Sequence, residues 1–241
     1  MRDFGYAGAG LVLGVLVCAT AQGAAATMYG LPMLERDDFT RLARAANVPL
    51  FWNEDSVHPG MIDPAEVVVL GVGADRSQWI DEKGFTSAFE QAWKRLVEVR
   101  RREAVRKELD QGRPTLVRTD LSKASRDDRE LVKHLVVAAR RIDALYMKQL
   151  GADGLDKGLA PDDDASRALV HRNSGPWCEA AQTEKDPFCN GTPDFRPQRW
   201  GSYPIDEAQD AELCDRLKAL PNGQELLAPF TVVRKVNGQY V

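Results

Sequence analysis

Histidine is scarce in this sequence, and His58, His134 and His171 are the only three among 241 residues. They lie far apart along the chain, and none has a second histidine or a cysteine nearby at metal-ligand spacing. No Ser/His/Asp or Cys/His set for nucleophilic catalysis stands out either. The sequence therefore predicts no catalytic residue and no cofactor held by this chain alone.

An excess of positive charge is also missing, since the formal net charge is −4 at pH 7. This balance argues against a nucleic-acid-binding protein. A phosphate-binding loop is absent too, because Gly71-Val-Gly73 lacks the third glycine and the following helix that a dinucleotide site needs. The partner class that remains is a protein or a peptide, which the sequence does not identify.

The chain has an apolar run near its start, but a short one. Residues 7–18 are rich in glycine and alanine and are too few for a membrane span. Small residues follow at 19–21 and 24–26, as in a signal-peptidase site. Residues 1–26 are therefore predicted to be a signal peptide, and the mature protein to be periplasmic or secreted, with no integral membrane span. Attachment of a lipid to Cys18 is the alternative.

Cysteine is nearly as scarce as histidine, and removal of the signal peptide leaves Cys178, Cys189 and Cys214. In an oxidising compartment, Cys178 and Cys189 are good candidates for a disulfide, because they lie close together in a turn-rich stretch. Cys214 would then be left over on its helix. Three reduced, buried thiols are the alternative.

What the chain does have is a set of helical patterns with few strands. Helices are predicted over 35–48, 85–111, 127–150, 162–171 and 207–220, and a strand over 230–235 leads into a hairpin turn at Val236–Gln239. The basic residues of 94–107 alternate with glutamates and indicate a solvated, salt-bridged face. The broad apolar stripe of 127–150 predicts the core helix. The predicted fold class is α+β, mainly α-helical, with a short C-terminal β-hairpin.

An irregular aromatic stretch runs from Arg172 to Pro204, with no apolar period and several turn signals. Its rings must still be buried, because each brings about 150–250 Å² of surface. The expected structure is a loop that packs across helices through its aromatics. The alternative is a binding loop, whose candidate residues are Asn173, Trp177, Trp200 and Tyr203.

Residues 27–72 contain an EF-hand-like helix–loop segment. Asp55, Gly60, Asp63 and Glu66 occupy positions 1, 6, 9 and 12 of a calcium loop, but Val57 and Pro59 replace two side-chain ligands. Asp55, Asp63 and Glu66 are therefore the candidate ligands in a weak hypothesis that this degenerate loop binds Ca²⁺. The run from Glu66 to Leu70 is either the exiting helix of that motif or a short strand.

Residues 73–241 carry a resemblance in the order and spacing of several short motifs. The matching positions are Thr119–Ser122, the helix around Ala138–Gln149, Asn173–Trp177, Pro187-Phe188, Tyr203-Pro204 and Pro229–Arg234. In this order they resemble the N-terminal lobe of bacterial members of the dipeptidyl-peptidase III family of zinc metallopeptidases. The zinc motif of that family (His-Glu, three residues, Gly-His) does not occur in the sequence, and Cys178 stands where an acidic residue is expected.

Three functions follow from these observations. The first is an exported, non-catalytic relative of the peptidase family, a binding or scaffold module. In the second the chain is the N-terminal fragment of an active dipeptidyl peptidase, with the zinc in a catalytic lobe outside it; the short return strand Gln239–Val241, which looks unfinished, favours this alternative. The third is an extracellular module that binds Ca²⁺.

Overall fold

The computed structural model describes residues 26–113 and 115–241. The predicted signal peptide, apart from its last residue, and Cys18 therefore lie outside the described residues. The chain divides into two compact units. The larger unit holds residues 26–147 and 152–197, and the smaller unit holds residues 148–151 and 198–241. Among the described helices, none is both long and apolar enough to cross a membrane.

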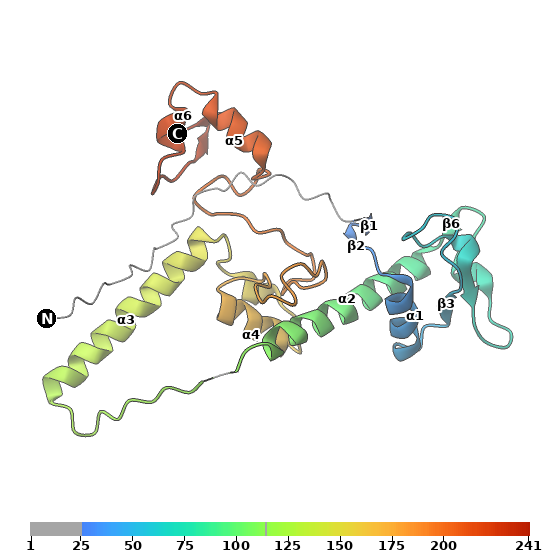
Figure 1. Ribbon diagram of the computed structural model, residues 1–241, viewed down its shortest axis with the longest axis horizontal. Coiled ribbons are helices and arrows are strands. Elements are labelled where there is room, and N and C mark those ends of the chain that lie inside the picture. The colour runs from blue at the N-terminus through green and yellow to red at the C-terminus, as the bar shows by residue number, and fades with distance from the viewer. Residues whose placement is uncertain (1–25, 114) are drawn as a thin grey trace, which may run out of the picture. The chain divides into compact units, whose positions relative to one another are not determined.

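The element order is that of a mainly helical α+β protein, which confirms the predicted fold class (Figure 1). The larger unit contains β1 (Thr27–Met28), β2 (Leu31–Pro32), α1 (Arg36–Ala45), β3 (Leu50–Trp52), β4 (Val67–Val69), β5 (Ile80–Asp81), β6 (Gly84–Phe85), α2 (Ser87–Asp110), α3 (Arg126–Gln149, whose end reaches the smaller unit) and α4 (Asp164–Asn173). The smaller unit contains α5 (Ala211–Lys218), α6 (Gly223–Leu226), β7 (Lys235–Val236) and β8 (Gln239–Tyr240). Each strand pairs with one neighbour in a short antiparallel ladder.

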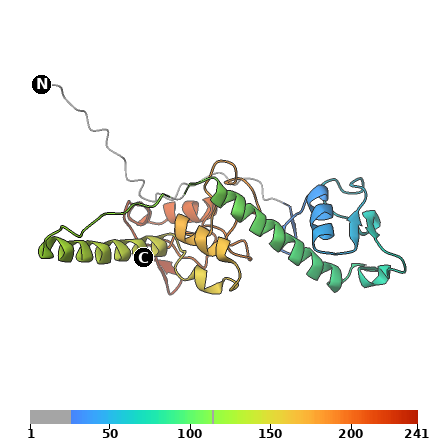
Figure 2. The same ribbon diagram turned by 90° about the horizontal axis from the view of Figure 1, so that it is seen from below.

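Helix α2 is the centre of the larger unit, and α1 and α4 pack against it (Figures 1 and 2). Thr86 caps its start, because the Thr86 hydroxyl accepts from the Phe89 amide at 3.4 Å. Its apolar face is built from aromatic rings, and Trp93 lies 5.9 Å from Phe39 of α1, centroid to centroid. Both side chains are almost fully buried. Rings of this size supply most of the area that a small core can bury.

Of the two alternatives for Glu66–Leu70, the exiting helix and the short strand, the structure has the strand. Val67–Val69 form strand β4, which pairs with β3 in the register Leu50↔Val69 and Trp52↔Val67. Three consecutive β-branched valines fit a pleated strand better than a helix exit. The loop that carries Asp55 is therefore held between two strands.

Helix α3 was predicted to be the core helix, and this prediction was wrong. None of its side chains is buried in the described part of the chain. Its start is as predicted, because Ser125 and Asp128 exchange hydrogen bonds in a capping box. A broad apolar stripe shows that a face needs cover, but it does not show which element supplies that cover. The buried stripe belongs to α2 instead.

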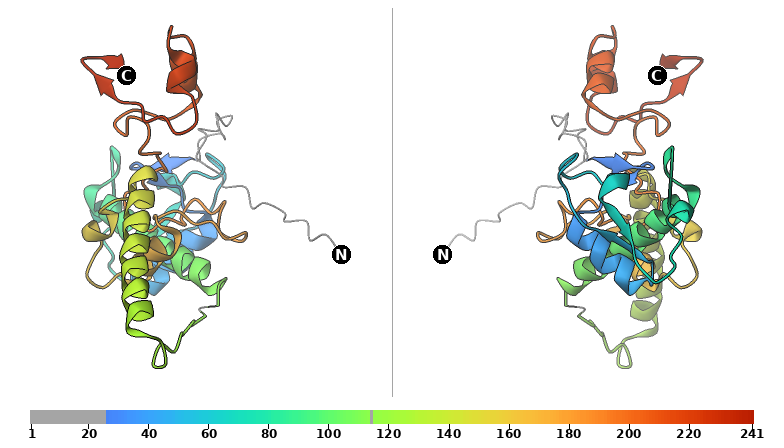
Figure 3. Two further views of the ribbon diagram at one scale, coloured as in Figure 1. Left: turned by 90° about the vertical axis from the view of Figure 1, so that its left-hand side faces the viewer. Right: turned by 90° about the vertical axis from the view of Figure 1, so that its right-hand side faces the viewer.

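The smaller unit has its own core of Tyr203, Leu213, Leu217, Leu226 and Val233, and α5 and the β7–β8 hairpin are its main elements (Figure 3). The predicted hairpin turn is present, with positive φ at both Asn237 and Gly238, as a type I′ turn requires. The predicted strand over 230–235 is shorter than expected and begins at Lys235. The predicted helix over 207–220 begins only after Asp210, whose side chain caps it through the Leu213 amide.

Candidate binding site

An open hollow of about 640 Å³ lies in the larger unit. Three separate segments line it. They are the stretch through β2 into α1 (Pro32–Asp37, with Ala26), the loop after β3 (Asp55 and Gly60) and Pro187. Pro32, Met33 and Pro187 supply apolar surface, and Leu34 beside them is fully buried in the core. We refer to this feature as the α1 hollow.

The α1 hollow has a negative rim. Glu35, Asp37 and Asp55 bring three carboxylates, and Arg36 is the one basic side chain among the lining residues. Arg36 lies 3.6 Å from Asp37 in an exposed ion pair. Such exposed pairs contribute little to stability, so their groups remain accessible to a ligand. The rim favours cationic groups over anions.

Asp55 is held in place by its own loop. Both carboxylate oxygens accept from the Gly60 amide, at 2.9 and 3.1 Å. Gly60 has φ +81°, a left-handed conformation that favours glycine. One amide does not use all the lone pairs of a carboxylate. Asp55 can therefore accept further hydrogen bonds from a group in the hollow.

Arg100 of α2 fixes two walls of the hollow relative to each other. Its guanidinium donates to Asp38 in the first turn of α1 at 2.8 Å and to Asp186, the residue before Pro187, at 3.0 Å. The same group lies 4.9 Å above the Phe188 ring. Burial alone raises the pKa of Asp38, but hydrogen bonds from Arg41 and Arg100 outweigh it and hold the pKa below its usual value.

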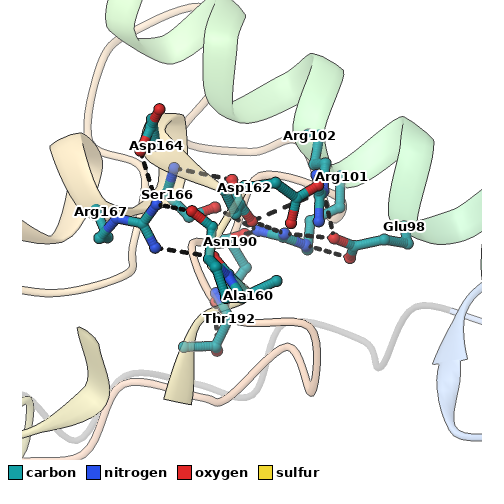
Figure 4. Close-up of polar contacts among 12 residues, drawn as sticks. Glu98, Arg101, Arg102, Ala160, Asp162, Asp164, Ser166, Arg167, Asn190 and Thr192 are labelled. Atoms are coloured by element: carbon teal, nitrogen blue, oxygen red, sulfur yellow. Dashed lines mark hydrogen bonds and ion pairs between the residues drawn. The ribbon is translucent and has the colours of Figure 1, made fainter. Parts of the chain in front are cut away.

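Further along α2, Arg101 is fully buried and joins α2 to α4 and to the loop at Asn190 (Figure 4). It donates to Asp163 at 2.5 Å, to the Ser166 hydroxyl at 2.7 Å and to the Asn190 carbonyl at 2.9 Å. Glu98, on the preceding turn of α2, accepts from it as well. The sequence predicted a solvated face here. That prediction is wrong for Arg101, whose partners come from segments far along the chain.

Glu108, near the end of α2, is a buried carboxylate with a full set of donors. It accepts from Arg172, from the Thr183 hydroxyl and from the amides of Glu179 and Ala180. Burial raises the pKa of Glu108, but these hydrogen bonds, with that of Thr183 foremost, hold it below its usual value. The carboxylate thus organises the loop around residue 180, and it is occupied by protein groups rather than directed at a ligand.

The predicted disulfide between Cys178 and Cys189 is present, with the two Cα atoms 5.7 Å apart. It closes the loop that carries Asp186 and Pro187. Glu108 and the two sulfurs are the only three His, Cys, Asp or Glu donors grouped at metal-ligand distance in the described chain. With both sulfurs joined to each other, neither is a thiolate ligand. The sequence analysis gave Cys214 no disulfide partner. In the structure Cys214 lies buried in α5 and is not a free thiol.

Replacing both Cys178 and Cys189 by serine is expected to lower the free energy of unfolding. The cysteines are 11 residues apart, and a closed loop of this length contributes about 3 kcal/mol by restricting the unfolded chain. Urea unfolding followed by tryptophan fluorescence measures the difference. A loss below about 1 kcal/mol would show that the disulfide does not hold this loop.

The structure does not gather the three carboxylates of the Ca²⁺ hypothesis into one ligand cluster among the described residues. Asp55 accepts from Gly60, Asp63 caps a short turn through the Ala65 amide, and Glu66 accepts from the amides of Ser56 and Val57. Hydrogen bonds, with that of Val57 foremost, keep the pKa of Glu66 below its usual value. Calcium binding stays a prediction, which a calorimetric Ca²⁺ titration tests. Only Asp55 of the three lines the α1 hollow.

The residues of the predicted binding loop fall in different units. Asn173 and Trp177 belong to the larger unit, where the Asn173 amide donates to the Trp177 carbonyl at 2.8 Å. Trp200 and Tyr203 belong to the smaller unit and pack in its core. The structure therefore does not describe these four residues as one site. The sequence did not indicate Glu35 and Asp37 as binding residues. Acidic residues at the start of a helix are already accounted for by their interaction with the helix dipole.

Comparison with known proteins adds no relative. No family model matches the chain, and it has no match among the curated proteins or the solved structures. The resemblance to the dipeptidyl-peptidase III family therefore rests on the sequence motifs alone.

Proposed function

We propose that this chain is an exported, non-catalytic binding module that holds a short cationic peptide segment in the α1 hollow. The observation that carries the proposal is the combination of an apolar floor with three rim carboxylates, Glu35, Asp37 and Asp55. An apolar surface with a few placed polar groups is the usual composition of a ligand site. The motif order resembles the N-terminal lobe of the peptidase family, and the zinc motif of that family does not occur in this sequence.

The charge of the rim selects the ligand class. Three carboxylates against Arg36 alone favour a lysine side chain or a free α-amino group over an acidic peptide. The apolar floor around Pro32 and Met33 favours an aliphatic side chain beside that charge. A dipeptide unit with one cationic and one aliphatic group satisfies both parts of the hollow.

The contacts behind the walls of the hollow support this proposal, because they keep the hollow formed in the absence of a ligand. Arg100 ties the first turn of α1 to the residue before Pro187, and the disulfide closes the loop behind Pro187. Walls that are already ordered do not have to lose conformational freedom on binding, which improves affinity. The buried charges of α2 therefore stabilise the walls of the hollow, and the carboxylates of its rim bind the peptide.

Isothermal calorimetry with the peptide Lys-Leu-Lys-Leu at low salt tests the proposal. Binding to the full chain is expected, and the neutral peptide acetyl-Gln-Leu-Gln-Leu-amide should bind at least fivefold more weakly. Asp55→Asn should weaken binding of the lysine peptide about fivefold, equivalent to about 1 kcal/mol for one exposed charge pair.

The matched control is Asp63→Asn, which removes a carboxylate of the same loop that does not line the hollow. This variant should bind the lysine peptide like the unaltered chain. Equal affinity for the charged and neutral peptides, or equal losses for the two variants, would contradict the proposed site.

A further inference from the structure

Helix α3 presents an unusual amount of apolar surface for a single helix. It spans 24 residues, and none of its side chains is buried in the described structure. Leu131, Leu135, Ile142 and Leu145 are 57%, 58%, 65% and 61% exposed. A helix of this kind gains most of its stability from burial of its apolar face, so exposed leucines in a row call for a partner.

The spacing of these residues is that of a helix pair. Leu131, Leu135, Ala138, Ile142 and Leu145 follow one another at intervals of four, three, four and three. This is the a/d pattern by which two helices insert side chains between each other. At 1.5 Å per residue the helix is about 36 Å long, so the stripe runs along most of one face. Figure 2 shows α3 as one continuous straight helix.

We propose that two copies of this chain associate through antiparallel packing of their α3 helices. The exposed area fits such a pair. Leu131, Leu135, Ile142, Leu145 and the adjacent Tyr146 are each about half or more exposed, and at roughly 120 Å² each they present about 600 Å² per copy, or about 1,200 Å² in total, the lower end of specific interfaces. The stripe is therefore sufficient for a reversible dimer.

The helix dipole favours the antiparallel arrangement. Charges of both signs are mixed along α3, with Arg126, Asp127, Asp128, Arg129 and Glu130 in its first turns, so side-chain charge does not select an orientation. Antiparallel packing opposes the two helix dipoles. A register that sets Ala138 against Ile142 of the second copy pairs a small side chain with a large one.

Sedimentation equilibrium of the full chain at 5–100 µM tests the association. A dimer is expected at the upper end of this range, and Ile142→Asp is expected to raise the dissociation constant at least tenfold. Ala144→Asp makes a comparable change on the opposite face of α3 and should dimerise like the unaltered chain. Leu145→Lys should repeat the effect of Ile142→Asp. Circular dichroism checks that the variants retain their helix content.

A spin label at residue 130, placed by Glu130→Cys, tests the orientation. In the proposed register the two labels are offset by about 20 residues along the helices, or about 30 Å. A parallel pair would bring them within roughly 15 Å and would overturn the antiparallel proposal. A monomer at 100 µM, or loss of the dimer in Ala144→Asp as well, would overturn the association itself. Because α3 does not line the α1 hollow, these variants should leave peptide binding unchanged.

Discussion

Arg101→Met is expected to lower the free energy of unfolding by about 3–5 kcal/mol, because it removes one partner of a buried ion pair. Asp163, the other partner, is only 3% exposed and would keep only the more distant Arg102, at 3.8 Å, as a cationic partner. The Asn190 carbonyl and the Ser166 hydroxyl would lose a donor at the same time. Methionine fills a similar volume, so the loss would report the charge rather than a cavity. Urea unfolding at pH 7 measures it.

Arg102→Met is the matched control for this prediction. The Arg102 side chain is 22% exposed and pairs with Glu98, with the exposed Asp162 and, at 3.8 Å, with Asp163. Its removal is expected to cost about 1 kcal/mol or less, since water can solvate Glu98 and Asp162 and Asp163 keeps its shorter contact with Arg101. Adding Asp163→Asn to Arg101→Met should recover part of the loss. Equal losses for Arg101→Met and Arg102→Met would show that the buried network does not hold α4 to α2.

Glu108→Gln is expected to cost about 3 kcal/mol at pH 7, and its effect should shrink in acid. The amide keeps the shape of the side chain but has one acceptor oxygen, and its nitrogen would face donors such as the Ala180 amide or the Thr183 hydroxyl. Hydrogen bonds to a charged group contribute about 1.5–3 kcal/mol each, and a buried donor without a partner adds a further penalty.

The pH dependence follows from the lowered pKa of Glu108 in the folded protein. The unfolded chain takes up a proton at a pKa of about 4.3, above that of the folded state. The stabilisation is therefore fully present above about pH 5 and is lost as the pH falls through the folded pKa. Unfolding free energies of both proteins between pH 3 and pH 7 should converge towards the acid end.

Glu103→Gln is the control for this second prediction. Glu103 is also on α2, but its side chain is 37% exposed and pairs with Arg41 at the surface. Its loss is expected to cost about 1 kcal/mol or less, with little change in the shape of the pH curve. If the Glu108→Gln curve runs parallel to that of the unaltered chain, the carboxylate does not have the stabilising role assigned to it.

Local features of this fold could be predicted from the sequence because their causes lie within a few residues. The cap at Thr86, the capping box at Ser125 and the turn at Asn237-Gly238 depend on side chains and backbone angles of adjacent positions. The pairing of Cys178 with Cys189 could be predicted for a similar reason, since a short separation within one loop favours it.

The burial of Arg101 and Glu108 could not be predicted in this way. Both occupy helical positions that also suit a solvated face, and their partners Asp163 and Thr183 lie 62 and 75 residues further along the chain. Sequence spacing on α2 does not indicate which distant segment covers it. The α1 hollow could not be predicted for the same reason, because its walls come from residue 26, residues 32–37, residues 55 and 60, and residue 187.

The EF-hand interpretation shows how a local pattern can mislead. Ligand spacing from Asp55 to Glu66 fits a calcium loop, but the motif also needs a helix after the loop. The valines of 67–69 pair with β3 instead. In α3 the apolar period predicted the core helix, and that prediction was wrong, because none of its side chains is buried in the described structure.

Hydrogen–deuterium exchange of the full chain, with and without the peptide Lys-Leu-Lys-Leu, tests the central claim most directly. The proposed function predicts that added peptide slows exchange of amides in residues 33–37, which line the hollow, and in the loop 55–60, whose first and last residues line it. Asp55→Asn should abolish most of this protection. Protection confined to residues 172–178, or no protection at peptide concentrations that saturate the calorimetric signal, would contradict a binding site in the α1 hollow.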